Sequence, residues 1–130
     1  MDIKEFAEKF IEAEHQVIQQ DDFSALEQIE SPGIIFHMSP PPDLVGFEAH
    51  KQYLVSSKET VSEIHQEWDY LTGDGNVAVL SLIQKMTFKE EHPVLKIPKG
   101  SKVTTDGFMV LRRENDKIAE IWAHSNITVE

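Results

Sequence analysis

The sequence predicts an α+β fold in which three N-terminal helices pack on one face of a curved, mainly antiparallel sheet. Residues 3–20 space their apolar side chains as on one face of an α-helix. The second half of the chain alternates strand-like runs with short groups of turn-forming residues. The last two runs, within residues 103–129, are apolar on both faces, which favours cover on both sides of the sheet.

The first helix is expected over residues 3–20, with Asp2 in position to cap its N-terminus. Glu14 falls on the apolar stripe of this helix rather than on its polar face. A short second helix is expected over residues 23–29, ended by the Ser-Pro-Gly triplet at residues 31–33.

A short strand is expected over residues 33–38, followed by a rigid loop at residues 39–43. Three consecutive prolines in that loop remove three backbone donors, so it cannot be regular structure. The third helix is expected over residues 47–57, where it would bury Phe47 and Leu54.

A four-strand antiparallel meander completes the predicted fold. Its strands are expected over residues 61–72, over residues 77–88 and in the two arms of a hairpin within residues 103–129. The connection at residues 89–102 is polar and contains prolines, which indicates either a lid or only a loose hairpin end.

Alternation along the last arm predicts which side chains share a face of the sheet. Ile118 is expected on the same face as Trp122. The opposite face would hold the remaining apolar side chains, Ala119, Ile121, Ala123 and Ile127.

Length and composition bound the function. The 130 residues suit one domain, residues 1–130. A net charge of −11 repels phosphate backbones and anionic lipid, so nucleic-acid binding and membrane binding are not expected. No apolar run approaches the roughly 20 residues that cross a bilayer. The chain has no cysteine, which is compatible with a cytoplasmic location.

Three sequence segments carry a family resemblance: PPPDLVG before the third helix, GDGNVAV at a hairpin turn, and LRRENDKIAEIW near the end. Together with the order of elements they resemble the SnoaL-like branch of the nuclear transport factor 2-like superfamily, which includes ketosteroid isomerases and polyketide cyclases. The best-matched pattern lies in the final hairpin, at Arg112, Lys117, Ile118, Glu120 and Trp122.

The resemblance implies a cystatin-like cone, in which the curved sheet and the helices enclose an apolar pocket, and a homodimer formed through the outer sheet face. The pocket would be lined partly by Met38, Tyr53, Trp68, Met109 and Ala123. Three of these, Met38, Met109 and Ala123, stand where relatives often carry an aspartate, so the usual catalytic carboxylates of the family are missing here.

Two residues remain as candidates for proton transfer. Glu14 would become a usable acid or base if the apolar pocket raised its pKa, although its side chain could instead reach the helix edge and meet water. His37 could carry protons near neutral pH, or could be a structural histidine facing away from the pocket. No metal-ligand spacing is present among the histidines, and neither a metal nor a cofactor is expected.

Two functions are therefore expected as alternatives. The first is binding of a small apolar or aromatic molecule, with isomerase, cyclase or hydratase chemistry led by Glu14. The second is a non-catalytic dimerisation or accessory module whose own side chains fill the pocket. An open cavity of about 300 Å³ or more would favour the first.

Overall fold

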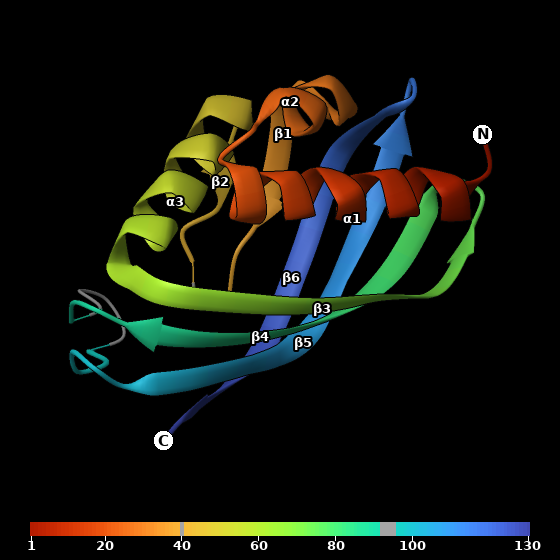
Figure 1. Ribbon diagram of the computed structural model, residues 1–130. Helices are drawn as coiled ribbons and strands as arrows, with labels where there is room; N and C mark the ends of the chain where they lie inside the picture. The colour runs from red at the N-terminus through yellow and green to blue at the C-terminus, as the bar shows by residue number, and fades with distance from the viewer. Residues whose placement is uncertain (40, 92–95) are drawn as a thin grey trace.

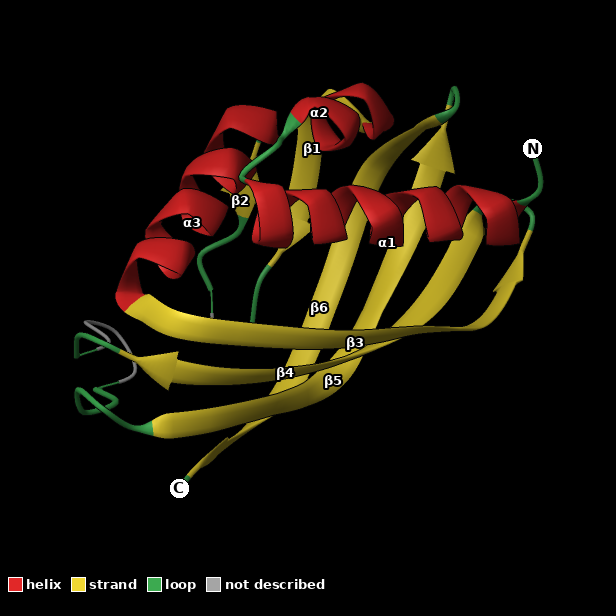
Figure 2. Ribbon diagram, in the orientation of Figure 1, coloured by secondary structure: helices red, strands yellow, loops and turns green. Residues whose placement is uncertain are grey.

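Three helices lie over one face of a strongly curved six-stranded sheet, as Figures 1 and 2 show. The computed structural model describes residues 1–39, 41–91 and 96–130. The α+β class, the three N-terminal helices and the curved sheet are thus confirmed. No helix in this described part of the chain is long and apolar enough to cross a bilayer.

The helices are α1 (Ile3–Gln20), α2 (Ser24–Ile29) and α3 (Phe47–Thr60). The side chain of Asp2 accepts a hydrogen bond from the backbone N–H of Glu5 at 2.8 Å, so α1 has the predicted cap. α3 continues three residues beyond the predicted end, to Thr60, before the chain turns extended at Val61.

The strands are β1 (Glu30–His37), β2 (Leu44–Val45), β3 (Val61–Asp74), β4 (Val77–Phe88), β5 (Lys102–Glu114) and β6 (Lys117–Val129). Their order in the sheet is β2-β1-β6-β5-β4-β3. β3 to β6 form the predicted antiparallel meander, whereas β1 runs parallel to β6. The parallel pairing places the start of β1 beside the core, beneath the helices.

β1 begins earlier than the sequence indicates. The strand expected from residue 33 starts at Glu30, so the triplet at residues 31–33 lies inside it. Its pairing with β6 is irregular between Glu30 and Ile35, and proline, which has no N–H to donate, fits such a stretch. The two-residue strand β2, for which no strand was expected, follows the loop at residues 39–43 and pairs with Ile35 and Phe36.

A β-bulge in β6 makes the predicted position of Ile118, on the same face of the sheet as Trp122, wrong. Arg112 pairs with Glu120 but Arg113 pairs with Ile118, so Ala119 is an extra residue on β6. The extra residue shifts the alternation by one position. Ile118 therefore points into the core with Ile121, both fully buried, and does not share the outer face with Trp122.

The main core lies between the helices and the concave face of the sheet. α1 contributes Phe6, Phe10 and Val17, which pack against buried residues of β1, β4, β5 and β6. A second, smaller cluster at the other end of the sheet joins Val61, Phe88, Ile97 and Val103. The expectation of a lid at residues 89–102 lies partly outside the described residues.

Gly107 allows the unusually close approach of β5 to β6. A Cβ at this position would lie 2.0 Å from the carbonyl oxygen of His124 and 2.6 Å from the Cα of Ser125. We expect Gly107→Ala to lower the free energy of unfolding by about 1–3 kcal/mol, because backbone atoms must move to make room. Urea unfolding checks this. Gly33→Ala is the control, since nothing lies within 4 Å of its Cβ position; equal unfolding midpoints for the two variants would contradict the prediction.

Candidate functional site

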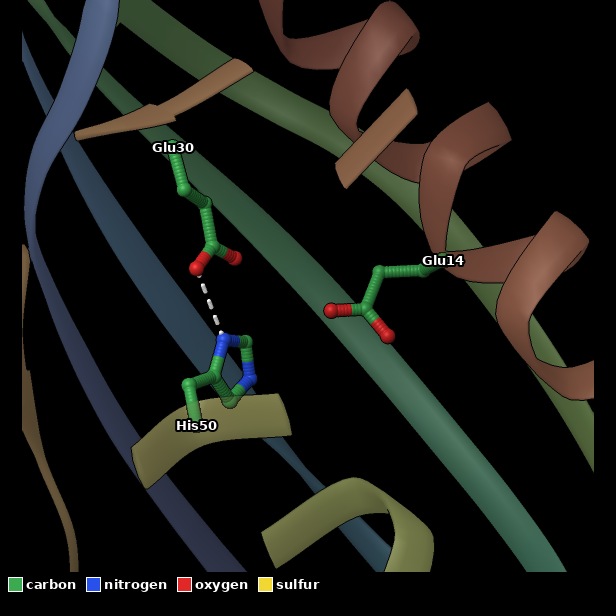
Figure 3. A group of neighbouring side chains, drawn as sticks. All are labelled: Glu14, Glu30 and His50. Atoms are coloured by element: carbon green, nitrogen blue, oxygen red, sulfur yellow. Dashed lines mark hydrogen bonds and ion pairs between the residues drawn. The ribbon is translucent and has the colours of Figure 1, made fainter. Parts of the chain in front are cut away.

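Three buried polar side chains come together beneath the helices. Glu14 comes from α1, Glu30 from the first position of β1 and His50 from the first turn of α3 (Figure 3). Their exposed fractions are 2%, 0% and 2%, and within the described part of the chain they are the buried polar or charged residues. Such groups are rarely buried without partners, so their arrangement needs an explanation.

Local structure explains how each side chain points inward. Glu14 lies on the same stripe of α1 as Phe10 and Val17, and all three are buried. His50 follows the buried Phe47 by three residues, so both lie on the inner face of α3. Glu30 enters the core because β1 starts there, beside Ile118 of β6.

The cluster is only partly satisfied by hydrogen bonds. Nδ1 of His50 donates to Oε1 of Glu30 at 2.9 Å. One carboxylate oxygen of each glutamate and one ring nitrogen of His50 all lie within 4.8 Å of one another. Oε1 of Glu14 and Oε2 of Glu30 have no hydrogen-bond partner among the described residues. Figure 3 shows the carboxyl group of Glu14 directed toward the other two side chains.

Burial and mutual charge shift the proton affinities of the cluster. Burial raises the pKa of Glu14 from 4.5 to about 7; the charge of His50 opposes this rise and that of Glu30 adds to it. For His50, burial disfavours the charged form, but the hydrogen bond and charge of Glu30, with the charge of Glu14, raise its pKa above 6.5. The cluster can therefore gain or lose a proton near neutral pH.

The sequence singled out Glu14 but missed Glu30 and His50. The one local signal for His50 was its spacing from Phe47, three residues along the same helix. Glu30 gave none, because it lies between a helix and a strand in the sequence. The spacing argument that predicted no metal site compared sequence neighbours, whereas this cluster joins three elements whose atoms lie near enough to hold an ion.

The five residues predicted to line a pocket divide into two groups. Met38, Trp68, Met109 and Ala123 are partly buried and pack against the main core. Tyr53 is exposed on α3. Their role in binding a ligand stays a prediction.

Two surface hollows, each of about 420 Å³, lie elsewhere and touch none of these five residues. One lies beside β1 and the β5–β6 turn and includes Arg112 and Glu120. The other lies across the ends of β3, β4 and β5 and includes Glu63 and Lys85.

His37 lies on the opposite side of β1 from the cluster. The ring of Phe36 faces His50, with centroids 4.8 Å apart, so strand alternation turns His37 to the outer face. There its Nδ1 is 2.9 Å from a carboxylate oxygen of Asp43, and its Nε2 is 2.8 Å from one of Glu120. The hydrogen bond with Glu120 is the main cause of a raised pKa for His37, which partial burial opposes. The structure thus does not bring together the two predicted proton-transfer residues, Glu14 and His37.

Solved structures with the same architecture are numerous. AclR from Streptomyces galilaeus, described as a candidate hydroxylase, aligns with a TM-score of 0.76 and 17% identity over 96% of this chain and 91% of that one. SalBIII, an epoxide hydrolase/cyclase-like enzyme in pyran ring formation in salinomycin, aligns with a TM-score of 0.75 and 18% identity over 99% and 98% of the two chains. These similarities establish the fold.

A candidate SnoaL-like polyketide cyclase from Mesorhizobium loti aligns with a TM-score of 0.72 and 23% identity, over 95% of this chain and 99% of that one. No curated protein sequence matches the chain. The family model of the SnoaL-like polyketide cyclases, however, matches residues 8–128, which is nearly the whole sequence. Together with the cone of helices and sheet, this match shows that the chain belongs to the SnoaL-like polyketide cyclase family.

Proposed function

We propose that the protein binds a small apolar or aromatic molecule on the concave side of its sheet and transfers a proton on it through Glu14. The observation that carries this proposal is the position of Glu14: a carboxyl group with a free oxygen, inside an apolar layer and next to a hydrogen-bonded Glu30–His50 pair. Membership of a family whose name denotes cyclases supports the same class of chemistry.

The surroundings of Glu14 suit reversible proton transfer. Phe10, one turn earlier on α1, packs edge-on against Trp68 with ring centroids 5.7 Å apart, which provides aromatic surface near the carboxyl group. A carboxylate in such a place can take a proton from an activated C–H or O–H group and return it to another atom. Isomerisation, ring closure and hydration each use such a transfer.

Deuterium exchange into 1-indanone tests this directly. The carboxylate of Glu14 would remove a proton from the carbon beside the carbonyl, and the enolate would take up a deuteron from solvent. We expect metal-free protein in EDTA to accelerate this exchange, and Glu14→Gln to reduce the acceleration by about 100-fold. NMR of the probe measures both rates. Glu12→Gln, an exposed neighbour on α1, is the matched control and should keep the wild-type rate. Equal rates for wild type and Glu14→Gln would reject Glu14 as the base.

The proposal includes a homodimer formed through the outer sheet face. Phe108 of β5 is 56% exposed there and Trp122 of β6 is 39% exposed. Val110, two residues after Phe108 on β5, pairs with Trp122. Exposed aromatic groups on one face are typical of an interface. We expect sedimentation to show a dimer for the wild type and a monomer for Phe108→Glu. Val45→Glu, on the exposed edge strand β2, is the control and should stay dimeric. A wild type that is still monomeric at 100 times the protein concentration of the exchange assay would contradict the dimer.

Other parts of the proposal follow from the sequence. A catalytic role for His37 stays a prediction, and its place on the outer face associates it with the proposed dimer surface, where its ring stacks on Trp122. A cytoplasmic location is favoured by the absence of cysteine.

A second candidate function is a non-catalytic module whose own side chains fill the cone. One observation favours it: the two hollows described above lie away from Met38, Trp68, Met109 and Ala123, which instead pack against the core. In that case no aromatic ketone, alcohol or hydrocarbon probe would bind in ligand-observed NMR, while the dimer would persist. Saturable binding of any of these probes would reject this alternative.

A further inference from the structure

The Glu14–Glu30–His50 cluster carries more negative charge than its own hydrogen bonds satisfy. Two carboxyl groups face one imidazole, and among the described residues that imidazole is hydrogen-bonded to Glu30 alone. Oε1 of Glu14 and Oε2 of Glu30, on side chains that are almost completely buried, have no partner among the described residues. A buried carboxylate is strongly disfavoured without a compensating positive charge or a proton. The cluster is therefore a place where a cation would be stabilised.

We propose that this cluster binds one divalent transition-metal cation of the Zn²⁺ class, with Glu14, Glu30 and His50 as its protein ligands. Their ligand atoms lie within 4.8 Å of one another and come from three elements that enclose them. Imidazole nitrogen with carboxylate oxygen suits Zn²⁺ and similar ions, whereas Mg²⁺ and Ca²⁺ prefer oxygen ligands alone. Three protein ligands would leave a fourth position on Zn²⁺ open, as in catalytic rather than structural zinc sites.

The available atoms define how the ion would be held. Oε1 of Glu30 is occupied by His50, so Oε2 of Glu30 and Oε1 of Glu14 are the free carboxylate oxygens. Because a carboxylate bonded to Nδ1 of His50 cannot also reach an ion on Nε2 of the same ring, an ion held by all three residues would replace the proton between Nδ1 of His50 and Oε1 of Glu30. Ligand atoms of a tetrahedral zinc site lie about 3.4 Å apart, whereas the three ligand atoms here lie within 4.8 Å of one another, so the side chains would draw closer together on binding.

This inference uses the proposed site but does not depend on proton transfer there. A cation and a proton on Glu14 are alternative ways to neutralise the same charge. Bound metal would therefore suppress the exchange activity proposed for Glu14, or replace it with chemistry at the open position. Metal binding without exchange activity in the metal-free protein would support this inference and reject the proposed function. Exchange activity without metal binding would support the proposed function and reject this inference.

Calorimetric titration of metal-free protein with ZnCl₂ at pH 8 tests the site. We expect saturable binding of one Zn²⁺ per chain, with MgCl₂ at least tenfold weaker. Glu14→Gln and Glu30→Gln should each weaken Zn²⁺ binding at least about tenfold, because each removes a charged ligand. Glu12→Gln and His65→Ala are controls, since Glu12 is exposed and His65 belongs to an exposed pair with Glu67 that could bind zinc adventitiously. Loss of binding in His65→Ala, with binding retained in both cluster variants, would overturn the proposal.

A second measurement uses the wild type alone and so does not depend on variants that fold. The titratable groups that face one another here are Glu14, Glu30 and His50. Carboxylate and imidazole groups bind a metal ion only in their deprotonated forms, so we expect the affinity for Zn²⁺ to be lower at pH 6 than at pH 8. No saturable Zn²⁺ binding at pH 8, or an affinity that does not change with pH, would overturn the proposal.

Discussion

Replacing His50 with leucine is expected to lower the free energy of unfolding of the metal-free protein by about 3–5 kcal/mol. His50 donates the hydrogen bond that Oε1 of Glu30 accepts at 2.9 Å, and both side chains are almost completely inaccessible to water. Removing the imidazole leaves the carboxyl group of Glu30 buried without a partner, and the loss of the positive charge also affects Glu14. Urea unfolding followed by circular dichroism measures the effect.

A double variant separates loss of the pair from loss of packing. In Glu30→Leu/His50→Leu both polar groups are replaced, so no carboxyl group is left unpaired at position 30. Replacing a whole buried ion pair by apolar side chains is often neutral or stabilising. We therefore expect the double variant to be more stable than His50→Leu alone. If the two were equally unstable, packing around α3 rather than the polar pair would be the cause.

Raising the pH from 5 to 9 is expected to reduce the stability of the metal-free protein, with Glu14 contributing about 3 kcal/mol. Its pKa is 4.5 in its ordinary state and about 7 in the folded protein, a difference of about 2.5. The folded state therefore binds the proton more tightly, so the stabilisation is complete below pH 4.5 and is lost as the pH rises through 7. His50, whose pKa is also raised on folding, acts in the same direction above pH 6.5.

Glu14→Gln is the variant that identifies the group responsible. A glutamine cannot ionise, so the part of the pH dependence that Glu14 contributes should disappear, leaving the change from His50. Urea unfolding at pH 5, 6, 7, 8 and 9, in EDTA, measures both profiles. Glu12→Gln, exposed on the same helix, should retain the wild-type profile. Parallel profiles for wild type and Glu14→Gln would show that this carboxyl group titrates normally.

Local sequence patterns predicted most secondary structure closely. The limits expected for the first helix and for the strand at residues 77–88 are those of α1 and β4. Both are set by short-range effects: an apolar period that matches the element, and a cap or turn at its end. The errors lie where pairing between strands determines the limits of an element. The early start of β1 depends on its pairing with the distant strand β6, and β2 depends on its pairing with β1, and periodicity within one segment encodes neither.

The bulge in β6 shows how one residue changes a prediction about faces. Strict alternation placed Ile118 with Trp122, but the extra residue at Ala119 turned Ile118 into the core. The sequence contained the apolar residues but not their register, because a bulge is selected by how two strands fit together. The bulge lies opposite Arg112 and Arg113 of the partner strand β5.

The sequence by itself determined the fold class, the family and the candidacy of Glu14, because these depend on residue types and on periods within one element. Only the tertiary structure placed Glu30 and His50 beside it. Glu30 follows Glu14 by 16 positions in the sequence, and His50 follows Glu30 by 20. The three residues meet because α1, β1 and α3 pack around one point. The physical reason is that burial, and with it the pKa of Glu14 and the affinity for a cation, belongs to the packed assembly rather than to any one segment.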